Sequence, residues 1–390
     1  MAYDFNQVVD RRGSSSLKWD VKENELPMWV ADMDFKAAPC IREALEKRLA
    51  QGIYGYSIEP EEWAKSYVSW WQRRHGLQMK EEELVFVTGV VPAISSAVRK
   101  FTTPGEKVAV MTPVYNIFFN SIVNNGRTPL QCQLDYKDGA YSLNFASLEA
   151  VLSDPQVSLL ILCNPQNPVG KIWSKEELAT IGAMARKHGV LVFSDEIHCD
   201  LTDPGKEYVP FALASEENRM NSVTAMAPTK CFNIAGIQTA AVYAANPVLR
   251  HKIWRQINTD EVGEGNVFAA DAAIAAFNEG EPWLEELRAY IYENKQYVYQ
   301  FVKEHLTKVH AVPQDCTYLM WLDVRAYIGE GETSKGLAQR IREKTGLYLS
   351  NGRQYRGDGD SFLRLNVACP RVTLEEGLLR LKKGLEEEVL

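Results

Sequence analysis

Three apolar runs in the middle of the chain each lead to a residue that could do chemistry. Residues 158–163 precede an Asn-Pro-Gln-Asn-Pro-Val-Gly phrase that contains Asn167, residues 190–194 precede Asp195, and residues 222–226 precede Lys230. An amine can bind an aldehyde covalently, and a carboxylate can hold a ring nitrogen in its protonated form. An amide can donate hydrogen bonds to a ring oxygen. These roles would support one reaction only if the fold brought the three groups together.

The elements between these residues indicate how they would meet. Residues 175–188 have apolar positions at three- and four-residue spacing, and Gly189 follows as a stop, which predicts a helix. Short apolar runs that alternate with such helices predict buried parallel strands in an α/β domain. Ligands of open α/β sheets bind beyond the carboxyl ends of the strands. We therefore expect Asn167, Asp195 and Lys230 to converge there, where they would suit pyridoxal phosphate.

Each of these residues taken alone has an ordinary structural explanation. A lysine after a strand is usually a surface residue, and an aspartate is often a cap or a turn former. The repeated Asn-Pro pair could be a rigid loop, because each proline restricts the residue before it. The three together are more specific than any one of them.

Longer sequence motifs around these residues resemble those of a known enzyme family. Asn-Pro-x-Asn-Pro-x-Gly, Ser-Asp-Glu-Ile-His at 194–198 and Lys230 before Cys-Phe-Asn-Ile-Ala-Gly resemble fold type I enzymes of the class I/II aminotransferase group, which use pyridoxal phosphate. Trp-Val-Ala-Asp-Met-Asp at 29–34, together with residues 194–198, resembles the MalY/PatB-type cystathionine β-lyases, or C–S lyases. The resemblance runs from about Asp4 to the C-terminus. It implies an α/β fold with a mostly parallel large domain and a smaller α+β C-terminal domain.

A helix start and a threonine are candidates for binding the cofactor phosphate. Residues 83–88 read as a strand and are followed by Gly89, Val90 and Val91 at the start of a helix. Free backbone N–H groups and the positive end of the helix dipole make such a start an anion site. Thr229 offers a hydroxyl to the same phosphate. Relatives often carry serine at the position of Ala227, so one phosphate contact could be missing here.

An arginine lies inside the apolar run at residues 362–367. Because a buried guanidinium is costly unless it is paired, Arg364 is either an outward-facing edge residue or a clamp on a substrate carboxylate. The resemblance favours the clamp, with Asn167 as a second contact and the backbone near Ala31 beside the same carboxylate.

The resemblance also implies roles for three rings. Tyr115 would stack on the pyridine ring, although a core tyrosine is the alternative. Tyr56 would reach the phosphate of a neighbouring subunit, with Tyr54 as a competing candidate, so the protein would be a homodimer with shared active sites. His198 stands where many relatives have tyrosine, either near the ring oxygen or in a supporting position. The catalytic candidates are Lys230, Tyr56 and Tyr115.

Composition sets the outer limits. The chain of 390 residues is long enough for two domains, and its formal net charge of −8 argues against non-specific nucleic-acid or anionic-membrane binding. The seven cysteines are scattered without metal-binding spacing, which suits a reducing cytoplasm. We find no signal peptide and no run of apolar residues long enough to span a membrane. We expect an N-terminal arm over residues 1–37, a large cofactor-binding domain over 38–289 and a small domain over 290–390.

The resemblance, carried by the phrase at 29–34 and by His198, implies a β-lyase that converts cystathionine or other S-substituted cysteines to a thiol, pyruvate and ammonia. Lys230 would remove the α-proton while negative charge spreads into the cofactor ring above Asp195. An aminotransferase would share all of these residues, so that alternative stays open. A regulatory protein that keeps the fold and binds a transcription factor is a second alternative.

Overall fold

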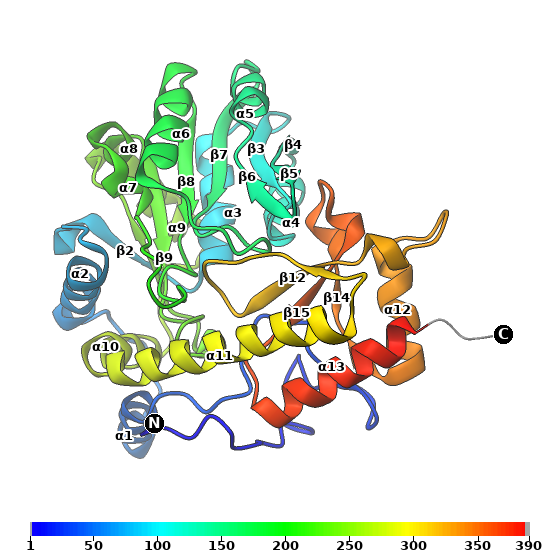
Figure 1. Cartoon of the computed structure of the whole chain (residues 1–390). Coiled ribbons are helices and arrows are strands. Elements are labelled where there is room, and N and C mark those ends of the chain that lie inside the picture. The colour runs from blue at the N-terminus through cyan, green and yellow to red at the C-terminus, as the bar shows by residue number, and fades with distance from the viewer. Residues whose placement is uncertain (1, 387–390) are drawn as a thin grey trace.

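The main sheet of the protein has seven strands and forms the upper half of the molecule in Figure 1. The structure, a computed structural model, describes residues 2–386. The strand order is β2-β10-β9-β8-β7-β3-β4. The strands are β2 (Leu84–Val87), β3 (Lys107–Thr112), β4 (Thr128–Gln133), β7 (Val157–Cys163), β8 (Leu191–Asp195), β9 (Ser222–Met226) and β10 (Ala240–Tyr243). Within this sheet β10 pairs antiparallel with both of its neighbours, whereas β4, β3, β7, β8 and β9 run parallel. The predicted mostly parallel α/β sheet is confirmed.

Alternation along the strands explains why helices cover both faces. In β7, Leu159 and Ile161 pack in one core cluster, whereas Leu160 and Leu162 pack in another, because successive side chains of a strand point to opposite faces. The first cluster includes side chains of α3 (Val90–Phe101), α4 (Ile117–Val123) and α9 (Pro247–Thr259). The second includes side chains of α5 (Phe145–Leu152), α6 (Lys175–Lys187) and α7 (Phe211–Ala214).

A smaller antiparallel sheet lies below the main one, with the order β11-β12-β15-β14 (Figure 1). Its strands are β11 (His310–Ala311), β12 (Leu319–Asp323), β14 (Ser350–Asn351) and β15 (Phe362–Asn366). The long helix α11 (Glu281–His305) crosses the molecule beneath it, with α13 (Arg371–Leu385) beside α11 and α12 (Ser334–Thr345) at the right. The predicted small-domain boundary at residue 290 falls inside α11.

The remaining elements complete the outside of the fold. They are α1 (Pro39–Ala50), α2 (Glu61–His75), α8 (Glu216–Met220), α10 (Ala269–Glu279) and the hairpin β5 (Asp135–Lys137) and β6 (Ala140–Ser142). Short 3-10 turns cover Glu81–Glu83, Ala235–Ile237, Arg325–Tyr327, Gly352–Tyr355 and Gly359–Ser361. No helix of the described residues is both long and apolar enough to cross a membrane.

Two expectations from the sequence need correction. The sequence at 347–350 predicts a single strand, but the structure splits it: β13 (Leu347–Tyr348) pairs in parallel with β1 (Leu26–Pro27) of the N-terminal arm, whereas β14 joins the small sheet. A single apolar run does not reveal this change of partner. The sequence at 374–390 predicts a final helix, whereas α13 ends at Leu385; residues 387–390 lie outside the described part of the chain.

Candidate active site

The strand register brings the three central candidates to one edge of the main sheet. Asp195 at the end of β8 pairs with Cys163 of β7 on one side and with Ala225 of β9 on the other. The loops that follow β7 and β9 therefore leave the sheet beside Asp195, and they carry Asn167 and Lys230. All three residues line one cavity of about 260 Å³.

Most of the predicted site residues line this cavity. They are Ala31, Gly89, Val90, Val91, Tyr115, Asn167, Asp195, His198, Thr229 and Lys230. Thr88, Pro92, Cys163, Ile197, Ala235 and Gln238 complete the lining. The cavity thus collects side chains from segments that are up to about two hundred positions apart in the chain.

Lys230 is held by backbone rather than by an acid. Its Nζ donates a hydrogen bond of 2.7 Å to the carbonyl oxygen of Ala31, which also accepts one of 3.1 Å from the hydroxyl of Tyr318. Burial, together with the positive charge of Arg364, lowers the pKa of Lys230 to about 8, against the opposing effects of Asp32 and Asp195. At pH 7 roughly a tenth of the amine is therefore neutral, far more than for an ordinary lysine, and this form can act as a nucleophile or a base.

Asp195 is a buried acid that lacks a full cationic partner. Its Oδ1 accepts a hydrogen bond of 3.1 Å from the backbone N–H of Ile197. Burial raises the pKa of Asp195 to about 7, and the Lys230 charge only partly offsets this rise. A protonated pyridine nitrogen would supply the missing positive charge. The acid therefore fits the ring of pyridoxal phosphate.

His198 and Tyr115 stay neutral in the same cavity. Burial, with the nearby charges of Lys230 and Arg364, lowers the pKa of His198 to about 3, and its Nδ1 is buried without a partner among the described residues. Burial raises the pKa of Tyr115 to about 12. A neutral imidazole with an unused nitrogen can accept or donate one hydrogen bond to a bound ring, which agrees with its predicted position near that ring.

The start of α3 offers backbone donors to an anion. Gly89 is the N-cap residue and no side chain caps the helix, so the first N–H groups of the helix stay available. Gly89, Val90, Val91 and Thr229 all line the cavity, as a phosphate site requires. Ala227 instead packs in a core cluster and contributes no polar atom. The phosphate contacts would therefore come from the helix start and Thr229.

Arg364 points from β15 toward Asn167. Its Nη1 donates to Oδ1 of Asn167 at 3.3 Å, and its Nη2 donates to the carbonyl oxygen of Trp29 at 3.0 Å. Its Nε is buried without a partner among the described residues. The side chain is 4% exposed, so the outward-facing alternative is wrong. Because Oδ1 of Asn167 accepts from the guanidinium, the amide hydrogens of Asn167 remain to donate to a ligand.

Tyr56 lies apart from these residues within the chain. It is fully exposed and lines a different hollow together with Tyr54, Ile237 and Phe268. Its predicted role concerns a neighbouring subunit and stays a prediction.

Two polar residues near the site were missed by the sequence analysis. Gln238 lines the cavity just before β10, with a left-handed backbone (φ 58°). Asn366 donates from Nδ2 to the carbonyl oxygens of Val30 and Asp32. Both positions read as strand residues, and no local signal separates them from ordinary polar residues.

Comparison with known proteins identifies the family. The model of the family "Aminotransferase class I and II" matches residues 26–381. The chain is 43% identical over 389 residues to cystathionine β-lyase PatB of Bacillus subtilis, with 98% of this chain and all of that protein covered. It is 33% identical to protein MalY of Escherichia coli, with 96% and 97% covered.

Solved structures agree with this result. A PLP-bound putative aminotransferase from Clostridium difficile superimposes with a TM-score of 0.95 at 37% identity, covering 98% of this chain and all of that one. Cystalysin from Treponema denticola, a structure that contains pyridoxal 5′-phosphate, gives 0.94 at 34% identity, with 99% of both chains covered. The predicted fold of a pyridoxal-phosphate enzyme and the resemblance to the MalY/PatB group are confirmed. The chain therefore belongs to the aminotransferase class I and II family.

Proposed function

We propose that the protein is a PLP-dependent carbon–sulfur β-lyase, which cleaves cystathionine and other S-substituted cysteines to a thiol, pyruvate and ammonia. The observation that carries this proposal is the single cavity in which the Lys230 amine, the Asp195 carboxylate and the Asn167 amide meet. The relatives named cystathionine β-lyase support the same chemistry.

The cavity residues divide the work of holding the cofactor. Lys230 would bind the aldehyde covalently, Asp195 would pair with the ring nitrogen, Tyr115 would pack on the ring and the start of α3 would hold the phosphate. When bound, the cofactor supplies an electron sink that makes the α-proton of an amino acid acidic.

The chain's own groups then orient the substrate and move the proton. Arg364 and Asn167 bind the substrate carboxylate, which fixes the α-carbon near Lys230. The Lys230 amine, which the substrate's own amine displaces from the cofactor, then takes the α-proton. The bond between the β-carbon and sulfur then breaks, sulfur leaves with the electron pair and takes up a proton, and the unsaturated amino acid hydrolyses to pyruvate and ammonia. The Ala31 carbonyl accepts a hydrogen bond from the resulting ammonium.

An aminotransferase remains the alternative, because the C. difficile structure carries that name. The two reactions differ in whether a leaving group is lost or the cofactor carbon is reprotonated. Incubation of the PLP-loaded protein with L-cystathionine in the absence of any keto acid separates them. Sustained pyruvate release is expected of a lyase, whereas an aminotransferase stops after one turnover.

Replacement of the amine tests the proposal directly. Lys230→Ala is expected to abolish pyruvate release and the visible absorbance of the lysine-bound cofactor, whereas Lys252→Ala, at an exposed position of α9, should keep both. Pyruvate release by Lys230→Ala at the wild-type rate would refute the proposed function.

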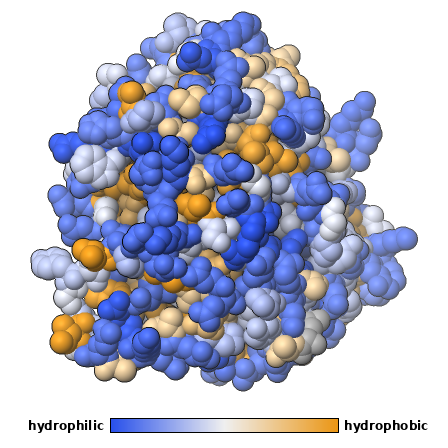
Figure 2. Space-filling view, turned by 90° about the vertical axis from the view of Figure 1, so that its left-hand side faces the viewer, coloured by the Kyte–Doolittle hydropathy of each residue, from blue (hydrophilic) through white to orange (hydrophobic). Residues whose placement is uncertain are grey.

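The homodimer is part of the proposal and is supported by exposed apolar side chains. Between α1 and α2, Ile53 is 79% exposed and Ile58 is 84% exposed, and Tyr54 and Tyr56 lie between them. Figure 2 shows hydrophobic residues that interrupt the hydrophilic surface on the side of the molecule that carries α1 and α2. A second copy would cover such residues and bring Tyr56 to the cofactor phosphate of its partner.

Location and domain division are proposed on similar grounds. All seven cysteines are free, which suits the reducing cytoplasm. The main sheet and the small antiparallel sheet support a division into a large domain (38–289) and a small domain (290–390), with residues 1–37 packing on the latter through β1 and β13.

A further inference from the structure

Residues 29–32, which include the Ala31 carbonyl that binds Lys230, are fixed by hydrogen bonds to their backbone carbonyl groups. The carbonyl oxygen of Trp29 accepts hydrogen bonds from Arg364 Nη2 at 3.0 Å and from Ser350 Oγ at 2.8 Å. Asn366 spans the carbonyl oxygens of Val30 and Asp32 at 2.7 and 2.6 Å. The Ala31 carbonyl between them is therefore fixed in direction, and it faces Lys230.

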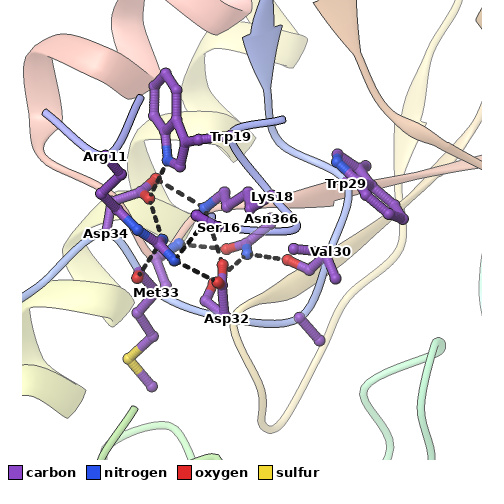
Figure 3. Close-up of polar contacts among 12 residues, drawn as sticks. Arg11, Ser16, Lys18, Trp19, Trp29, Val30, Asp32, Met33, Asp34 and Asn366 are labelled. Atoms are coloured by element: carbon purple, nitrogen blue, oxygen red, sulfur yellow. Dashed lines mark hydrogen bonds and ion pairs between the residues drawn. The ribbon is translucent and has the colours of Figure 1, made fainter. Parts of the chain in front are cut away.

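A group of four charged residues, the arm cluster, secures the other end of this segment. It consists of Arg11, Lys18, Asp32 and Asp34. Arg11 reaches Asp32 at 2.7 Å and Asp34 at 2.8 Å, and Lys18 reaches Asp34 at 2.7 Å and Asp32 at 3.7 Å. Figure 3 shows the two cations meeting both carboxylates, and it shows Asn366 bonded to Val30 and Asp32 beside them.

Two members of the arm cluster are buried, so their ion pairs restrain the backbone around Asp32. Lys18 is only 1% exposed and Asp34 only 4%. Buried charges are tolerated when they are paired and hydrogen-bonded, and the loss of one partner leaves an uncompensated charge. Trp19 adds a donor to Asp34 at 2.8 Å, and Arg11 Nη1 donates to the Met33 carbonyl at 3.0 Å. The polypeptide on both sides of Asp32 therefore has little freedom.

We propose that Asp32, held by Arg11 and Lys18, is a positioning residue that directs the Ala31 carbonyl toward the Lys230 amine. The N-terminal arm, which contains no catalytic candidate before Ala31, thereby acts on the base of the reaction. The inference rests on the proposed function, because it concerns the same lysine.

Several charged groups around Lys230 affect its pKa, and Asp32 is one of them. Arg364 from β15 disfavours the ammonium, Asp195 from β8 favours it, and the neutral rings of His198 and Tyr318 stand nearby. Asp32 also favours the ammonium, from the side of the Ala31 carbonyl. Loss of the Asp32 charge should therefore lower the pKa of Lys230, whereas loss of the Arg11 charge should raise it, since a cation that offsets Asp32 disappears.

The test measures Lys230 itself. Full-length protein stripped of cofactor is treated with an amine-reactive acetylating reagent at a series of pH values, and Lys230 modification is followed by peptide mass spectrometry. Asp32→Asn is expected to lower the midpoint by at least about half a pH unit, and Arg11→Gln is expected to raise it. In the PLP-loaded protein, the pH midpoint of the visible absorbance should move in the same two directions.

Asp34→Asn is the matched control, because it removes the same charge from the arm cluster. Its carboxylate contacts Arg11, Lys18 and Trp19, so it should reduce thermal stability and move the Lys230 midpoint by less than half as much as Asp32→Asn. Equal shifts for both aspartate variants, or an unchanged midpoint in Arg11→Gln, overturn the proposal. If Asp32→Asn does not fold, the partly exposed Arg11→Gln decides alone. Lyase activity is not needed for these readings, so a failed pyruvate assay would refute only the proposed function.

Discussion

At the scale of single residues, Asp195, Lys230 and His198 line one cavity, and their pKa values are shifted in different directions. Burial raises the pKa of Asp195 to about 7, and it lowers those of Lys230 to about 8 and of His198 to about 3. Each shift favours the neutral form, which is the expected effect of low polarity. A bound pyridinium would reverse this effect for Asp195 alone, because it adds a positive charge beside that acid.

The raised pKa of Asp195 predicts that the free energy of unfolding of the cofactor-free protein falls as the pH rises. Its pKa is 3.8 in the unfolded chain and about 7 in the folded one, so the folded state binds more protons between these values. The stability contribution of Asp195 is therefore present below pH 3.8 and is lost as the pH rises toward 7, at no more than about 1.4 kcal/mol per pH unit. Asp195→Asn should remove this loss.

Urea denaturation of the stripped protein across pH 4–8 checks this prediction. The difference in unfolding free energy between Asp195→Asn and the wild type should grow in favour of the variant as the pH rises. PLP-loaded wild-type protein is the control, since the pyridinium should flatten the same slope. His198 changes stability in the opposite direction over pH 3–6.5, but it is common to both proteins and cancels in the comparison. A constant difference at all pH values would contradict the prediction.

At the scale of elements, β15 carries a charged side chain, Arg364, in a strand that is otherwise mostly apolar. Arg364 lies in β15 among buried apolar neighbours, and the register places it between Trp321 of β12 and Ser350 of β14. The strand pairing on both sides fixes its backbone, so the guanidinium reaches Asn167 and Trp29 without a mobile loop. A planar fork at a fixed position is suited to bind a carboxylate.

Arg364→Lys should weaken substrate binding while it keeps the positive charge. An ammonium cannot make the paired hydrogen bonds of a guanidinium, so kcat/KM for cystathionine should fall roughly 10- to 100-fold, mainly through KM. Steady-state kinetics measure the effect. Arg353→Lys, at an exposed arginine in the 3-10 turn Gly352–Tyr355 that follows β14, should leave the kinetics close to wild type. An unchanged KM in Arg364→Lys would remove this residue from the substrate site.

At the scale of the whole molecule, a cavity is formed where the main sheet, the small sheet and the N-terminal arm meet. Asp195 ends β8 of the main sheet, and Lys230 lies in the loop after β9. Arg364 lies in β15 of the small sheet, Tyr318 directly precedes β12, and Ala31 belongs to the arm. The proposed second copy would add Tyr56 from the exposed segment between α1 and α2. The complete site would then need two chains.

Subunit mixing tests this shared site. Tyr56→Ala and Lys230→Ala should each be inactive or strongly impaired, because each lacks one part of every site. Unfolding and refolding the two variants together should restore pyruvate release, since a mixed dimer contains one site with an intact lysine and an intact tyrosine. Each variant refolded alone is the control. No recovery, from mixtures that sedimentation shows to be dimeric, would count against the role of Tyr56.

The sequence by itself determined the α/β class and the likeness to the aminotransferase family. It also indicated Asn167, Asp195 and Lys230, which lie at or just beyond the ends of β7, β8 and β9. These are local properties: apolar periodicity defines the strands, and polar residues after buried strands must gather at one edge. Only the tertiary structure showed which distant strands and side chains contact one another. It paired the run at 347–350 with two different sheets, brought Asn366 and Gln238 to the site, and joined Arg11 and Lys18 to the segment that holds Lys230. Such contacts link positions far apart in the chain, and the spacing of residues along the sequence does not encode which of them will touch.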